Sequence, residues 1–155
     1  MKINDAVFGE LEYDLLWSKD TSIVFLGHEV EIALMVKGAE DGKFDKEQYA
    51  AYTSLMQNWE QLQQSLLQSI LDYYKQERQD LGYDIEVNEN YPLVETTNEI
   101  SEMISLDGIV VPYVGSFDGR DIGLTFNCTW DIENGLGIRL LNEKVAEVGY
   151  QDVAI

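Results

Sequence analysis

The residues of this chain that could act as a nucleophile, a base or a soft metal ligand are few. His28 is the only histidine and Cys128 the only cysteine. Nucleophilic catalysis needs a base beside the nucleophile, and zinc sites need three or four soft ligands. No nucleophile motif surrounds either residue, so we interpret His28 as an exposed turn residue and Cys128 as a small buried side chain. A single cysteine also cannot form an intrachain disulfide.

Carboxylates are the abundant chemical groups, with 29 Asp+Glu in 155 residues. Several are separated by one residue, which places both on the same face of a strand. Paired carboxylates can hold a hard cation or act as acid and base on a glycosidic bond. In so acidic a chain, such pairs also arise as solvated strand faces, which is the interpretation we favour. The pairs are Glu10 and Glu12, Glu29 and Glu31, and Asp131 and Glu133.

The stretch from Asp131 to Gly135, D-I-E-N-G, resembles the start of a calcium loop. The match fails because its glycine stands at position five, whereas that loop requires it at position six. The later Gly135-x-Gly137 is not followed by a helix, so it is not a nucleotide fingerprint. We therefore expect no cofactor and no metal. We expect a hairpin with Asn134-Gly135 at its tip and a partly exposed Trp130 that forms a recognition patch with Asp131 and Glu133.

The formal net charge of -19 constrains the partner. Binding to nucleic acid or to an anionic membrane needs a basic surface, so both are disfavoured. A basic protein partner fits the charge, although high negative charge can also serve solubility alone. The span 84–107 contains seven acidic residues and no Lys or Arg, and we predict that part of it faces a partner. The predicted partner-binding residues are Glu89, Glu95, Glu99, Glu102, Trp130, Asp131 and Glu133.

The elements that must position these residues begin with strands. Apolar and acidic residues nearly alternate up to Trp17, and Ser18–Thr21 is interpreted as a polar break. A β-rich stretch follows at 22–26, then a tight turn or a bulge at Gly27-His28 and a strand at 30–36.

A long helix is predicted from Asp45 to Leu81, because this stretch has no Pro or Gly and its apolar residues recur every three or four positions. Asp45 with Gln48 fits a capping box, and Gly82 fits the left-handed residue after a helix end. Such a helix is roughly 50 Å long. It should therefore project beyond a sheet or bend within Gln57–Gln68.

The last third of the chain is predicted to be a strand meander, after a short helix at 97–104. Strands are expected at 108–115, 122–130, 136–141 and 145–148, with turns at Asp118-Gly119, Asn134-Gly135 and Asn142-Glu143. The order of strands, long helix and strands predicts an α+β fold, with antiparallel sheet packed on one central helix. We expect a single domain over residues 1–155. The acidic start and the lack of a long apolar run indicate a cytoplasmic protein.

Two stretches resemble a family of uncharacterised bacterial domains. They are F-D-K-E-Q-Y-A-A-Y at 44–52 and C-T-W-D-I-E-N-G-L-G-I-R at 128–139. The family resemblance is to a helix start I-S-x-x-Q-x-x-A-Y and a hairpin W-D-x-E-H-G-L-G-V. Asn134 stands where that pattern has histidine, which argues against a shared metal or acid-base site. Small acidic domains of this type resemble immunity and accessory proteins of bacterial toxin systems.

These observations favour a non-enzymatic protein-binding domain, in its most specific form an immunity-type inhibitor of a basic toxin. The alternative is a small-ligand or hydrolytic site that uses a carboxylate pocket near Trp130, Asp131 and Glu133. A third possibility is a homo-oligomer that docks through apolar helix positions outside the main stripe, such as Tyr49 and Leu67. We expect a monomer or a weak homodimer.

Overall fold

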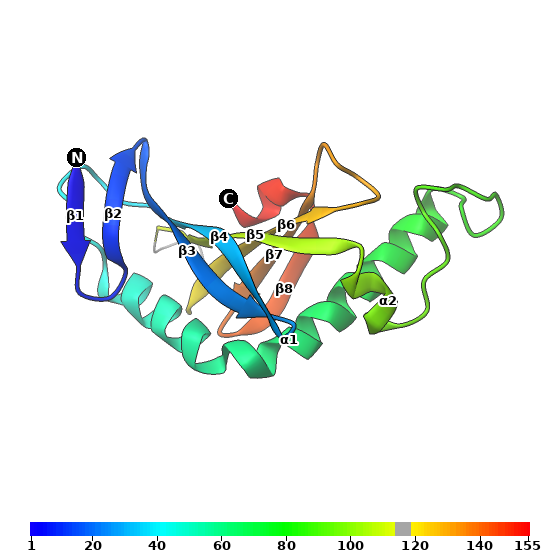
Figure 1. Ribbon diagram of the computed structural model, residues 1–155, viewed down its shortest axis with the longest axis horizontal. Helices are drawn as coiled ribbons and strands as arrows, with labels where there is room; N and C mark the ends of the chain where they lie inside the picture. Colours follow the sequence, from blue (N-terminus) through cyan, green and yellow to red (C-terminus); the bar gives the residue numbers. More distant parts are fainter. Residues whose placement is uncertain (114–118) are drawn as a thin grey trace.

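The computed structural model describes residues 1–113 and 119–155. Their elements, labelled in Figure 1, are β1 (Lys2–Asp5), β2 (Gly9–Asp14), β3 (Leu16–Phe25), β4 (His28–Val36), α1 (Lys46–Asp80), α2 (Thr97–Ser101), β5 (Ile104–Val111), β6 (Asp121–Cys128), β7 (Leu136–Leu141), β8 (Lys144–Gly149) and the 3-10 turn η1 (Gln151–Ala154). The predicted turn at Asp118-Gly119 includes a residue outside the described ranges.

The predicted fold class is wrong in its main feature. Within the described residues, the strands before and after the helix form one eight-stranded sheet in the order β1 to β8, so the sheet dominates the fold. The expectation was an α+β fold of strands, long helix and strand meander, with antiparallel sheet packed on one central helix. Strands β4 and β5 join the two groups of strands by parallel pairing, whereas all other neighbours in this sheet are antiparallel. A crossover helix such as α1 is what allows parallel pairing.

Strand β3 runs through the segment that was predicted to be a polar break. Ser18–Thr21 pair with β4 along the whole stretch, because backbone pairing does not require apolar side chains on the solvent face. The tight turn was predicted one residue late. It is formed by Leu26 and Gly27, whose φ values of 53° and 80° match a hairpin turn of the kind that needs two left-handed residues.

Helix α1 confirms the predicted long helix, with 35 residues from Lys46 to Asp80. At its end the amide of Tyr83 donates to the Arg78 carbonyl (2.9 Å) and that of Gly82 to Gln79 (3.0 Å), a Schellman motif with Gly82 at φ 82°. The helix is continuous. Figure 1 shows that it curves along the sheet and extends beyond β5. One stripe of it is buried: Leu55, Trp59, Leu62, Leu66, Ile70 and Tyr74.

The two faces of the sheet are covered differently. Helix α1 packs on one face, and the C-terminal turn η1 lies on the opposite face over β6 and β7 (Figure 1). Two glycines permit this contact, because a Cβ at Gly123 would collide with the Ala154 carbonyl, and one at Gly137 with the Tyr150 carbonyl. Among the described residues, none of the helices has the length and apolar character needed to span a membrane.

Candidate protein-binding site

A hollow of about 430 Å³ lies where β5 begins and β6 ends. The two strands are held together past their ladder by a hydrogen bond from the Thr129 amide to the Met103 carbonyl (2.9 Å). The loop after β6 overhangs the hollow with Ile132, whose side chain is 85% exposed. We call it the β5–β6 hollow, lined by Glu102, Met103, Ile104, Ser105, Asn127, Cys128, Thr129 and Ile132.

The loop that carries Ile132 is more than the predicted two-residue hairpin, since β6 ends at Cys128 and β7 begins at Leu136. Asp131 organises it. Its Oδ1 accepts from the Asn134 amide (3.1 Å), and its Oδ2 accepts from the Asn134 side chain (3.0 Å). The Asp131 carbonyl accepts from the amide of Gly135 (3.0 Å), which adopts φ 62°. These bonds fix the turn and leave Ile132 at its exposed tip.

Trp130 anchors this loop from below. The prediction that its side chain is partly exposed is wrong: it is 6% exposed. Its ring packs edge-on against Tyr74 of α1, with centroids 4.8 Å apart. The Tyr74 hydroxyl donates to the Pro92 carbonyl (2.5 Å) and so ties the acidic segment to the same cluster. Trp130 can therefore support a binding surface but offers little area to a partner.

Cys128 lies at the base of the hollow as a protonated thiol. Its Sγ is 3.4 Å from the Asp131 carbonyl, to which the thiol donates. Burial raises the pKa of Cys128 to about 11. Because the thiolate is the nucleophile, this residue is unreactive near neutral pH. The prediction of a small buried side chain is confirmed.

The acidic residues that were predicted to bind a partner lie in different parts of the structure and have different contacts. Glu102 lines the β5–β6 hollow. Glu99 accepts from the Thr96 hydroxyl (3.0 Å) at the start of α2, and Glu95 lies 3.4 Å from the Nζ of Lys75. Lys75 belongs to α1, so tertiary folding supplies a positive charge that the acidic span itself lacks.

Glu89 and Glu133 are exposed in two different loops. The structure therefore brings Glu102 to the hollow but does not gather the predicted acids into one cluster. Among the lining residues, Met103, Ile104 and Ile132 were missed by the sequence reasoning. One signal was present: Ile132 is an apolar residue within an otherwise polar turn.

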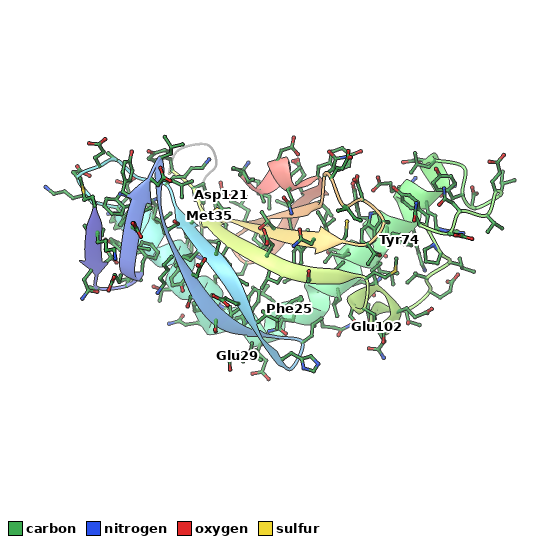
Figure 2. The ribbon with its side chains drawn as sticks, turned by 45° about the horizontal axis from the view of Figure 1, so that its top comes forward. Phe25, Glu29, Met35, Tyr74, Glu102 and Asp121 are labelled. Atoms are coloured by element: carbon green, nitrogen blue, oxygen red, sulfur yellow. The ribbon has the colours of Figure 1, made fainter. Side chains whose placement is uncertain are left out.

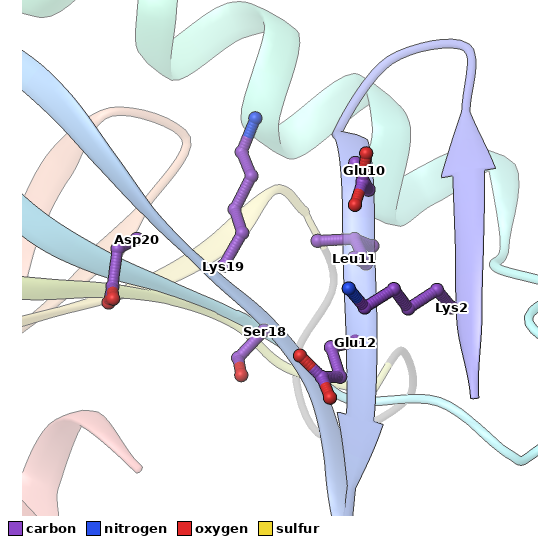
Figure 3. Close-up of a pocket in the computed structure, with 7 residues that line it drawn as sticks. All are labelled: Lys2, Glu10, Leu11, Glu12, Ser18, Lys19 and Asp20. Carbon is purple, nitrogen blue, oxygen red and sulfur yellow. The ribbon is translucent and has the colours of Figure 1, made fainter.

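A second hollow, of about 390 Å³, lies between β2 and β3 (Figure 3). Figure 3 shows Lys19 on β3 on one side and Glu10 and Glu12 on β2 on the other. Lys2 and Asp20 also line it, so charges of both signs are present. It offers little apolar surface, and we interpret it as a solvated charged groove.

The remaining candidates for site chemistry are metal-binding clusters and His28. Within residues 1–113 and 119–155, no three His, Cys, Asp or Glu side chains gather as they would around a metal ion. His28 is exposed at the start of β4, beside the β3–β4 turn.

A family model described as a domain of unknown function (DUF6985) covers residues 7–155. No curated protein and no solved structure matches the chain.

Proposed function

The chain belongs to the DUF6985 family of domains of unknown function, and from its own residues we propose that it is a non-enzymatic domain that binds a basic protein. The observation that carries the proposal is the β5–β6 hollow, an apolar site with an acidic residue at its edge. Its apolar contacts come from Met103, Ile104 and Ile132, and Glu102 supplies the charge.

Charge and shape support different parts of this proposal. The net charge of -19 favours encounter with a basic partner and raises its association rate. Charge alone gives little specificity at physiological salt, because exposed charges are screened within roughly 8 Å. An exposed apolar side chain such as Ile132 can act as the short-range anchor, since burial of a whole aliphatic side chain contributes about 1.5–3 kcal/mol.

The most specific form of the proposal is an immunity-type inhibitor of a basic toxin. A toxin that cleaves nucleic acid needs a basic surface to bind its substrate. An acidic domain that covers this surface would block the substrate by competing for the same charges.

The alternative site at Trp130, Asp131 and Glu133 gains no support from the geometry. Trp130 is buried, and the carboxylate of Asp131 accepts hydrogen bonds from Asn134. None of the three lines the hollow beside them.

The test is affinity capture at low salt with matched variants of the full chain. Ile132→Asp and Glu102→Lys alter the hollow. Leu15→Asp and Glu40→Lys make the same changes at exposed positions elsewhere. The proposal predicts that the wild type and both control variants retain a basic protein, which rising salt then releases. Both hollow variants should fail to retain it. Equal retention by all four variants, or no basic protein retained, would refute this site.

The captured protein then tests the inhibitor form. Expressed alone, it should arrest growth, and co-expression of the wild-type domain should restore growth, whereas the Ile132→Asp variant should not. If the captured partner is not toxic, the proposal of an immunity-type inhibitor is refuted, and the proposal of a domain that binds a basic protein stands.

A further inference from the structure

The sheet opens between β4 and β5. Their parallel pairing covers only Ala33–Val36 of β4 and Gly108–Val111 of β5. Figures 1 and 2 both show the earlier halves of the two strands diverging. Figure 2 labels Glu29 on β4 and Glu102 just before β5, near the diverging ends of the two strands.

The opening has a local cause in β5. The register of β5 against β6 shifts between Leu106 and Gly108, so Asp107 is the extra residue of a bulge. A bulge bends its strand and increases its twist. The bend occurs where pairing with β4 stops, and it directs the first half of β5 away from β4.

The β4 side of the opening carries unpaired backbone groups. Phe25 and His28 flank the two-residue β3–β4 turn and therefore form a hydrogen-bonded pair. Residues in an antiparallel pair alternate between bonded and non-bonded positions. The amides and carbonyls of Glu29 and Glu31 consequently point away from β3, into the opening.

The same alternation applies to the β5 side. The Met103 carbonyl accepts from Thr129, so the backbone groups of Ile104 and Leu106 point away from β6. Within the part of the chain that the structure describes, no backbone hydrogen bond crosses between these halves of β4 and β5. Two strand edges therefore face each other with free donors and acceptors.

The side chains around the opening define what could enter it. On the face away from α1, Glu29 and Glu31 are exposed on β4, and Ser105 and Asp107 on β5. On the α1 face the opening is floored by Phe25 and Phe126, both buried, with ring centroids 5.9 Å apart. A strand placed here would need basic side chains outward and small or apolar side chains toward the floor.

We propose that an extended basic segment of a partner protein pairs as an added strand with the open edges of β4 and β5, its Lys or Arg side chains facing Glu29, Glu31 and Asp107. Strand addition supplies affinity through main-chain bonds, and side chains supply specificity. The inference rests on the proposed function, because it gives the same basic partner a second contact beside the β5–β6 hollow. A second copy of this chain is disfavoured as occupant, because the carboxylates on the β4 edge would repel another acidic edge.

The probe is a synthetic peptide with blocked termini, Lys-Val-Lys-Ala-Lys-Val-Lys, measured by fluorescence anisotropy against the full chain at low salt. Its partner probe has the same sequence with N-methyl groups on alternate amides, which blocks pairing along one edge and keeps the charge. We expect the methylated peptide to bind at least about tenfold more weakly, since two or more hydrogen bonds are lost. Equal affinity of the two peptides would refute strand addition.

Two protein variants distinguish the contribution of backbone hydrogen bonds to peptide affinity from the contribution of charge. Glu31→Pro removes an amide that faces the opening and not the β3–β4 ladder, a position where strands tolerate proline. Glu31→Gln removes only the charge. The proline variant should lose at least about tenfold in affinity, and the glutamine variant clearly less, because one exposed ion pair is worth at most about 1 kcal/mol.

Amide hydrogen exchange of the wild type tests the same point without a mutation. Bound peptide should slow exchange at Glu29, Glu31, Ile104 and Leu106, and leave Val30 unchanged because its amide already pairs with Ile23. Binding without this protection would overturn strand addition and leave the β5–β6 hollow as the binding site. No binding of the peptide would also overturn it, and the capture experiment would judge the proposed function separately.

Discussion

Gln48 connects the helix start to the parallel junction of the sheet, and this connection can be tested quantitatively. The side chain is 3% exposed. Its Nε2 donates to the Lys37 carbonyl (2.8 Å) and to the Pro112 carbonyl (3.0 Å), just past the paired ends of β4 and β5. Its Oε1 accepts from the Asp45 amide (3.0 Å), which forms one half of the predicted capping box.

The change Gln48→Leu keeps the side chain's size and removes all three bonds. An unsatisfied buried polar group costs about 1–3 kcal/mol. Asp45 is exposed, so water can replace its bond, while the two carbonyls are partly buried. We therefore expect a loss of about 3 kcal/mol in the free energy of unfolding, which corresponds to a midpoint shift of about 1–2 M urea.

Gln48→Glu adds a pH dependence with a definite sign. A carboxylate cannot donate to either carbonyl, whereas a protonated carboxyl can donate its one proton to one of them, so the folded state raises the pKa of the new side chain. The stability contributed by a group with a raised pKa is present below the unfolded pKa and is lost as pH rises through the folded pKa. The Glu variant should approach the wild type at acid pH and fall below it near neutrality, whereas the Leu deficit should not vary.

Urea unfolding, followed by tryptophan fluorescence at several pH values, measures both effects against the wild type at the same pH. Gln57→Leu is the matched control, because Gln57 is exposed on the same helix. The reasoning would be refuted if both Gln48 variants unfolded at the wild-type urea concentration. A Glu variant whose deficit did not grow between acid and neutral pH would refute the assigned donor role.

Three further predictions concern other contacts. Gly123→Ala should lower the unfolding free energy by about 2 kcal/mol in urea titrations, because the added methyl collides with the Ala154 carbonyl. Alkylation of Cys128 at pH 8 should be about 100-fold slower in the folded protein than in urea, since burial raises its pKa to about 11 from the model-compound value of 9.0. Glu143→Gln should cost about 1 kcal/mol near neutral pH and nothing in acid, because the hydrogen bond from Arg120 lowers the pKa of Glu143 and that stability disappears as pH falls through the folded pKa.

Each of these three predictions has its own control or contradicting outcome. The added methyl of Gly149→Ala meets the Val153 side chain and no backbone atom, so it should cost less than Gly123→Ala, and equal losses would contradict the backbone collision. For the thiol, rapid alkylation of the folded protein would show that Cys128 is accessible and ionised. For Glu143, a deficit that persisted in acid would mean that its contact with Ser54, and not its charge, carries the effect.

The sequence predicted local features where a short pattern fixes the backbone. The helix from Lys46 to Asp80 follows from apolar residues that recur every three or four positions without interruption. Its end follows from Gly82, because glycine is the residue type that adopts φ 82° without steric strain. The turn at Asn142-Glu143 was predicted from the same kind of local signal, and both residues adopt positive φ. Strand β7 has the predicted bounds.

Features that depend on distant partners were missed. Trp130 is buried because Tyr74, far away in the sequence, covers its ring, and no local pattern reports that contact. Glu95 was assigned to an uncompensated acidic span, but Lys75 reaches it from the helix. The β5–β6 hollow was not predicted for the same reason. Two of its lining residues, Ile104 and Ile132, come from separate segments of the chain.

The sequence by itself determined a strongly acidic chain with one long helix between two sets of strands. Only the tertiary structure decided that those sets merge into a single sheet through the parallel pair of β4 and β5. The physical reason is that hydrophobic period and turn chemistry act over a few residues, whereas strand partners are chosen by which edges the curved helix brings together. The bulge at Asp107 then decided where that pairing stops and the sheet opens.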